Sequence, residues 1–377
     1  MSLDPADSDI GTLLGWPNGR IPGAEVRVER ENVDGGIDDP IVQTTNAEGR
    51  ATFSGIFAGI HRVSAIKVLT PGELAIVAQT RPLLRALAGG DKSVGEQDAT
   101  FPVTLRANRT DGFVLSEVST VDSAGGDGIW FGYLEVYNNS LDVRYLDGML
   151  LGRTVALQYE TAQRSCTEAA VRSNDPAGIW ARFIQRFPGS GTQYPVQPGE
   201  AVVLAFDAID HSQNRSWQLD LSDADFEFRT DSDADNPSVP DLRDVGPRKA
   251  LQSGIQFISG WHPAWLARSV EPTGLPEARV LAPGSDDTFV RLPTADIADV
   301  LDPITGEPGA PFTICPRSMH PNFSALPYVW KRRPNAHRMS QQRRPIGIAP
   351  GGWTILLDTN TSSVDWFEET RTPGDVP

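Results

Sequence analysis

The stretch GYLEVYNNSLDVRYLDGMLLG, Gly132–Gly152, alternates apolar and polar residues in the way that is typical of β-strands. The alternation covers Leu134–Val136, stops at a polar interruption, and resumes over Val143–Leu150. Within the interruption, Asn138 and Asn139 are residue types that tolerate the left-handed backbone conformation of tight turns. The stretch therefore predicts two paired strands joined by a polar turn.

Length and composition extend this prediction to the whole chain. With 377 residues, the chain is too long for one ordinary hydrophobic core, which predicts two domains. Its 39% hydrophobic and 22% charged residues are ordinary for a globular protein, whereas its 35 glycines and 30 prolines favour a fold rich in strands and turns. We expect an all-β protein made of two β-sandwiches.

The charge balance limits the kinds of partner. The chain has 49 acidic and 33 basic residues, and its net charge of -16 would repel a nucleic-acid backbone. No apolar run approaches the roughly 20 residues that a membrane-spanning helix requires. The N-terminal sequence lacks the basic and apolar segments of a signal peptide, which leaves open a cytoplasmic chain and one whose leader has been removed. Cys166 and Cys315 form no C-x-x-C pair, and either a long-range disulfide or two thiols is compatible with their spacing.

The first hundred residues contain a second strand-rich pattern. The sequences IPGAEVRV (21–28) and TTNAEGRATFSGIFAGIHRVSA (44–65) alternate around a tight turn at Asn46–Gly49. They resemble carboxypeptidase-regulatory-like and Cna-B-like β-sandwich modules, which are usually non-catalytic units of exported proteins. The resemblance implies a small regulatory-like, or transthyretin-like, sandwich over residues 9–108.

The rest of the chain resembles lamin-tail-like, Ig-like sandwiches, in which a strand with E-x-Y-N precedes a turn. It is also similar to an uncharacterised family of exported bacterial lipoproteins, through VQPGEAVVLAFDAIDH (196–211), LDLSDADFEF (219–228) and LLDTNTSSVDW (356–366). The resemblance implies a larger sandwich with long loops over residues 109–377 and a periplasmic or extracellular location, peripheral to a membrane. It implies no particular activity.

Two acidic segments could carry chemistry. Asp231, Asp233 and Asp235 alternate like the first half of a calcium loop, but the sixth position is Asn236 and the twelfth is Leu242, which excludes an EF-hand. A looser Ca²⁺ site and a flexible acidic loop remain as alternatives, and we favour the loop.

Asp207, Asp210 and His211 could form a metal site or an acid/base set, but they follow a hydrophobic strand, which favours a structural role at the strand end. The sequence has no G-x-S-x-G motif, no Walker loop and no G-x-G-x-x-G after a strand, which leaves open a Ser/His/Asp triad assembled from distant loops. We expect no cofactor other than that Ca²⁺.

Two further segments are predicted as contact surfaces, because aromatic residues and arginines are enriched at interfaces. One contains Trp261 and Trp265, for which burial in the core is the favoured alternative. The other lies at 331–345 and concentrates basic residues that could bind an acidic partner or anionic lipid headgroups, or could neutralise the chain's own carboxylates: Lys331, Arg332, Arg333, Arg338, Arg343 and Arg344.

The sequence thus predicts a non-catalytic structural or interaction subunit that docks onto a larger, membrane-associated protein assembly. The first alternative is a carbohydrate- or ligand-binding module that uses Trp130, Trp261 and Trp265 as stacking platforms. The second is a calcium-supported hydrolase with its site at residues 207–211. An exposed aromatic row would favour the first alternative, and convergence of Asp207, Asp210 and His211 in one pocket would favour the second.

Overall fold

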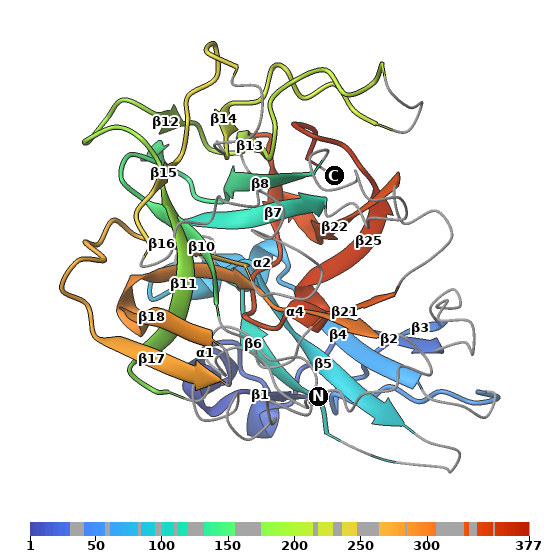
Figure 1. Cartoon of the computed structure of the whole chain (residues 1–377). Coiled ribbons are helices and arrows are strands. Elements are labelled where there is room, and N and C mark those ends of the chain that lie inside the picture. Colours follow the sequence, from blue (N-terminus) through green and yellow to red (C-terminus); the bar gives the residue numbers. More distant parts are fainter. Residues whose placement is uncertain are drawn as a thin grey trace. The chain divides into compact units, whose positions relative to one another are not determined.

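The computed structural model of the chain confirms the all-β class (Figure 1). It describes residues 1–30, 41–56, 61–81, 84–94, 100, 102–108, 112–119, 132–154, 175–213, 218–228, 236–246, 264–282, 285–306, 328–331, 338–349 and 351–376. None of the helices within these ranges is long and apolar enough to cross a membrane. Contacts divide the chain into a first unit, Met1–Asp111 with Arg344–Asp365, and a second unit, Gly112–Arg343 with Trp366–Pro377.

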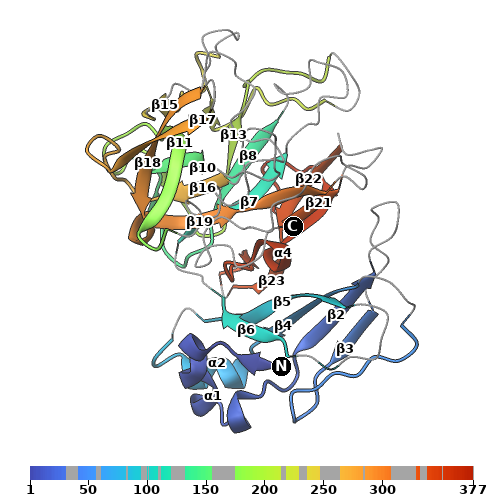
Figure 2. The same ribbon diagram turned by 60° about the horizontal axis from the view of Figure 1, so that its bottom comes forward.

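The first unit is built on a six-stranded sheet with the order β1-β6-β5-β4-β2-β3 (Figure 2). Its helix α2 (Pro71–Val77) begins with a capping box, in which Thr70 and Glu73 each accept a hydrogen bond from the other's backbone N–H. Inward side chains such as Val26 and Leu105 form the core of this unit. The strands are β1 (Ser2–Leu3), β2 (Glu25–Arg30), β3 (Ile41–Thr44), β4 (His61–Val68), β5 (Ala86–Val94) and β6 (Thr104–Ala107).

A late segment of the chain also belongs to the first unit. It contains the strand pair β23 (Pro345–Ile348) and β24 (Thr354–Leu356) and the short helix α4 (Ser362–Asp365). Buried side chains of this segment pack on Ala88 of β5. Sequence placed the boundary between residues 108 and 109 and gave all later residues to the second domain. That division stays a prediction, and the contacts differ from it in assigning 344–365 to the first unit.

The second unit is a sandwich of two large sheets. One has the order β14-β13-β8-β7-β22-β25, and the other has the order β17-β18-β11-β10-β16-β19 with β15 beside β11. The first sheet contains β7 (Phe113–Ser119), β8 (Tyr133–Asn138), β13 (Ala201–Ala205), β14 (Phe226–Glu227), β22 (Met339–Arg343) and β25 (Trp366–Thr370). The second contains β10 (Leu150–Thr154), β11 (Gly178–Arg186), β15 (Arg243–Asp244), β16 (Ala264–Ala267), β17 (Glu277–Ala282), β18 (Ser285–Pro293) and β19 (Ile297–Leu301). Two small strand pairs complete the unit, β9 (Arg144–Tyr145) with β12 (Pro195–Val196) and β20 (Pro303–Gly306) with β21 (Tyr328–Lys331).

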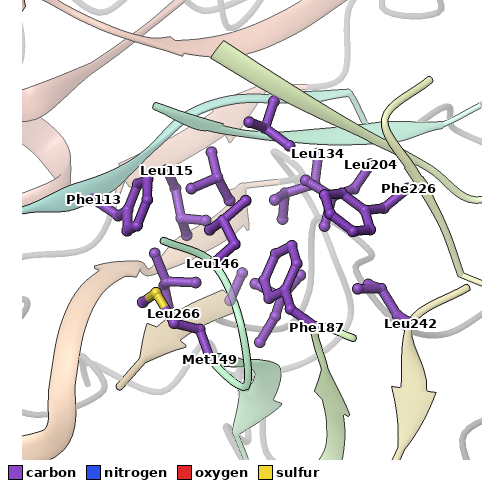
Figure 3. Packing of buried hydrophobic residues seen from close by; sticks show 14 of the residues in the cluster. Phe113, Leu115, Leu134, Leu146, Met149, Phe187, Leu204, Phe226, Leu242 and Leu266 are labelled. Carbon is purple, nitrogen blue, oxygen red and sulfur yellow. The ribbon is translucent and has the colours of Figure 1, made fainter. Parts of the chain in front are cut away.

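The main core of this unit lies between the two sheets (Figure 3). Leu115, Leu134 and Leu204 enter it from the first sheet, and Leu266 enters it from the second. Burial of each such side chain stabilises the fold by roughly 1.5–3 kcal/mol.

The decisive stretch Gly132–Gly152 does not form two strands paired with each other. Its first strand, β8, pairs with β7 and β13, whereas its second, β10, pairs with β11 and β16 in the opposite sheet. The prediction of a paired unit was therefore wrong. Because an alternating pattern specifies a half-buried strand but not its neighbour, the same residues fit a crossing between sheets. Leu146 and Met149 of the crossing fill the core.

Candidate functional site

The crossing between β8 and β10 begins at a buried asparagine that fixes the backbone. Asn138 is completely buried, and its Nδ2 donates to the carbonyl oxygens of Asp142, at 2.9 Å, and Val196, at 2.8 Å. Its Oδ1 accepts from both the backbone N–H and the hydroxyl of Ser140. The expected left-handed turn at Asn138 is absent, since Asn18 and Asn360 are the non-glycine residues with positive φ in the described part of the chain. Asn138 shapes this turn through its side chain instead.

A second anchor lies at the other end of the crossing. The Asp147 carboxylate accepts three backbone N–H groups, from Gly191 at 3.1 Å, Gln193 at 2.9 Å and Tyr194 at 2.8 Å. Partial burial by itself would raise the pKa of Asp147, but these three donors outweigh it and hold the pKa below its usual range. Asp147 thereby ties the loop that precedes β12 to the crossing, and β12 pairs with β9.

Between these anchors, the crossing presents apolar side chains to solvent. Leu141 is 40% exposed, Val143 is 39% exposed and Tyr145 is 41% exposed. We call these three side chains the knuckle surface. Large apolar side chains on a backbone that is already fixed lose little conformational freedom when a partner covers them, which favours binding. The sequence pattern predicts Val143 and Tyr145 as ordinary strand residues.

A buried carboxyl pair lies on the outer face of the first sheet of this unit, away from the main core. Glu117 of β7 and Glu135 of β8 are direct cross-strand neighbours, and each is 1% exposed. The Tyr133 hydroxyl donates to Glu117, and the Ser116 hydroxyl donates to Glu135 at 2.6 Å. Burial, with a smaller contribution from the neighbouring carboxyl of Glu117, raises the pKa of Glu135 to about 8, although the hydrogen bonds from Ser116 and Gly374 act in the opposite direction. Burial also raises the pKa of Tyr133, with Glu117 adding to the effect.

The raised pKa of Glu135 predicts a pH-dependent stability. In the unfolded chain this carboxyl titrates near 4.5 and in the folded chain near 8, so the folded state binds the extra proton between these values. The contribution of Glu135 to stability is fully present below pH 4.5 and is lost as pH rises to about 8, a change on the order of 5 kcal/mol. Urea unfolding of wild type and Glu135→Gln across this range should show that the loss disappears in the variant. Glu369→Gln, at an exposed position, is the matched control and should keep the wild-type loss of stability. If the unfolding free energies of wild type and Glu135→Gln change with pH in parallel, the prediction is wrong.

The turn at residues 207–211 carries structural interactions. His211 is buried, and its Nε2 lies 3.0 Å from the carbonyl oxygen of Asp207 and 3.7 Å from the Asp207 carboxylate. The Asp210 carboxylate instead accepts hydrogen bonds from Ser212 and Gln213, so it does not join the pair formed by Asp207 and His211. Glu227 accepts the Ala208 N–H at 3.0 Å and fixes the turn from the other side.

This arrangement matches the strand-end role that the sequence favoured and not a converging acid/base set. Among the residues that the structure describes, no group of three or more His, Cys, Asp or Glu side chains is placed to hold a metal ion.

The predicted contact residues separate into buried, exposed and undescribed positions. Trp265 is completely buried in the second sheet of the sandwich, which excludes it from an accessible surface, and core packing was the favoured alternative. Arg343 is also completely buried, so its assignment to a surface is wrong. Arg338 is exposed and Arg344 is partly buried. Lys331 ends β21. The remaining predicted positions lie outside the described residues: Trp130, Cys166, Asp231, Asp233, Asp235, Trp261, Cys315, Arg332 and Arg333.

Comparison with known proteins shows that part of the chain matches a family of unknown function. Residues 197–272 match the model of DUF4876, described as a protein of unknown function. The crystal structure of a DUF4876 family protein from Bacteroides thetaiotaomicron VPI-5482 is similar, with 18% sequence identity and a TM-score of 0.53. The alignment covers 94% of this chain and 92% of that chain. This likeness shows the fold, and no curated protein matches.

Proposed function

We propose that the chain is a non-catalytic interaction subunit that docks onto a partner protein through the knuckle surface, Leu141, Val143 and Tyr145. The observation that carries the proposal is the exposure of these side chains on a backbone fixed by Asn138 and Asp147. Exposed apolar groups on a rigid element are typical of interface anchors.

The polar groups that could serve catalysis make hydrogen bonds within the fold instead. Glu117 and Glu135 are buried and hold hydrogen bonds within the fold, and Asp207 and His211 face each other at a turn. The sequence similarity to exported modules supports a partner assembly outside the cytoplasm, at a membrane surface. The net charge of -16 favours a partner with a basic surface, which would be attracted before contact.

The proposal predicts that the knuckle surface controls association. Replacing Tyr145 by serine should weaken partner binding by about tenfold or more, which corresponds to about 1.4 kcal/mol, because an interfacial tyrosine is commonly a binding hot spot. The triple variant Leu141→Ser, Val143→Ser, Tyr145→Ser should abolish it. The measurement is native purification from the source cells, with mass spectrometry of stoichiometric co-eluting proteins and titration of the identified partner.

Ile348→Ser provides the matched control, because Ile348 is a 67% exposed apolar side chain of the other unit. The same partner should bind wild type and Ile348→Ser equally. A chain that purifies as a monomer without a stoichiometric partner, or a triple variant that binds like wild type, would overturn the proposal. Cell fractionation tests the location separately, and recovery of the chain with cytoplasmic proteins would contradict it.

A further inference from the structure

Beyond the knuckle surface, the first unit has an edge strand without the usual protection against pairing. Within the described residues, β3 pairs with β2 on one side and ends the six-stranded sheet on the other (Figure 2). Such an edge offers backbone N–H and C=O groups to any extended chain, and proteins commonly block it with a charged residue or a very short strand. β1, at the other end of this sheet, has two residues, whereas β3 has four and none is charged. The terminal strands of the two other large sheets each carry a charged residue: Glu227 in β14, Glu368 in β25, Glu277 in β17 and Asp299 in β19.

The backbone alternation of β3 directs two residues toward the open edge. Thr45, directly after the strand, donates its N–H to the Ala24 carbonyl at 2.8 Å. In an antiparallel pair, residues whose backbone groups bond to the neighbouring strand alternate with residues whose groups point away from it. Gln43, two residues before Thr45, therefore faces β2, whereas the N–H and C=O groups of Val42 and Thr44 point to the open edge.

The side chains of β3 indicate what an added strand must contain. Ile41 lies opposite Val28 of β2, which belongs to the core of this unit, yet Ile41 is 46% exposed. An apolar residue beside Ile41 would extend that core by one strand. On the other face, Val42 is 41% exposed and lies opposite Arg27, which is paired with Glu25 at 2.7 Å. The complementary segment is therefore extended, with apolar residues at alternate positions.

The charge of the chain decides between a second copy and another protein as the occupant. Two copies would each carry a net charge of -16 and repel each other, and a four-residue edge buries far less than the roughly 1,200–2,000 Å² of a stable dimer interface. A basic segment would instead be attracted before contact. We propose that the open edge of β3 is a second docking site, which binds an extended, basic segment of a partner protein as an added strand.

A synthetic peptide with this chemistry tests the proposal on the full chain. The probe is acetyl-Lys-Val-Thr-Val-Thr-Val-Lys-amide, whose valines share one side of an extended strand and whose lysines make it basic. At a free peptide concentration of about ten times Kd, about one chain in eleven remains unbound, so amide hydrogen exchange at Val42 and Thr44 should slow about tenfold. The amide of Val118, in β7 of the other unit, is the internal reference and should not change.

Two variants of β3 separate edge pairing from other modes of peptide binding. Val42→Pro removes an N–H that points away from β2, which a sheet edge tolerates, and its ring occupies the position of an added strand. It should weaken peptide binding by about tenfold or more. Ile41→Ser should weaken it about fivefold by removing apolar contact, and it keeps the test available if Val42→Pro fails to fold. Val68→Ser is the matched control, because Val68 is a 49% exposed valine of β4 in the same unit, and it should bind like wild type.

The outcomes that overturn the proposal are distinct from those that test the knuckle surface. The knuckle triple variant should bind the peptide like wild type. If the peptide leaves exchange at Val42 and Thr44 unchanged, or if Val42→Pro and Ile41→Ser bind it as wild type does, the edge is not a docking site. A peptide with both lysines replaced by glutamate should not bind, and equal binding would refute the basic partner. If wild type sediments as a dimer that Val42→Pro dissociates, the occupant is a second copy and the proposal is wrong.

Discussion

Replacing Arg343 by methionine is expected to destabilise the second unit by about 3–5 kcal/mol, because the change leaves a buried carboxylate without its cation. Arg343 on β22 is completely buried, and its Nη2 donates to Asp299 of β19. Its Nε donates to the Leu115 carbonyl at 2.7 Å, while Asp299 accepts the Leu115 N–H at 2.7 Å. The guanidinium also lies over the ring of Trp366, 4.8 Å from its centroid.

These contacts tie the two sheets of the sandwich together, so urea unfolding should show a lower midpoint for the variant. Arg338→Met is the matched control, because Arg338 lies in the same basic segment but is exposed, and its replacement should change stability by no more than about 0.5 kcal/mol. The double variant Arg343→Met, Asp299→Asn should recover part of the loss, since it removes both charges. Equal stability of Arg343→Met and Arg338→Met would contradict a structural role for the pair.

The second large effect is expected at Gly152, where alanine should cost about 1–3 kcal/mol through overpacking. A Cβ on this residue would lie 2.2 Å from Cζ2 and 2.7 Å from Cη2 of Trp265, and 2.5 Å from the Phe183 carbonyl oxygen. Gly152 faces Trp265 across β10 and β16, so the indole occupies the space that a side chain would need. Neither the buried indole nor the backbone carbonyl can move away without disturbing its own strand.

Thermal unfolding should therefore place Gly152→Ala well below wild type. Gly191→Ala serves as the control, since nothing lies within 4 Å of the position where its Cβ would be. Combining Gly152→Ala with Trp265→Phe should be less harmful than the sum of the single changes, because the smaller ring gives room to the new methyl group. If Gly152→Ala unfolds at the same temperature as Gly191→Ala, the close approach of Trp265 does not limit this position.

The knuckle surface shows why the candidate site was only partly predictable. The sequence located the polar interruption at Asn138 and Asn139, but it could not tell that Leu141, Val143 and Tyr145 would remain exposed. Their alternation is the same whether a strand pairs with its predecessor or passes to another sheet. The polar residues Asn138, Ser140 and Asp147 around them are the available signal, since such side chains commonly fix irregular backbone.

What the sequence determined by itself is the class of fold and the inward positions of its strands. The alternation of Leu134 and Val136 with polar neighbours sets one side of β8 against a core, because successive strand residues face opposite sides of a sheet. Tertiary structure alone decided which strands became neighbours, and with that the fate of the polar side chains. Arg343, Glu117 and Glu135 look like surface residues in the sequence, yet each is buried by partners distant along the chain. Burial and electrostatic pairing depend on three-dimensional neighbours, which the local pattern does not specify.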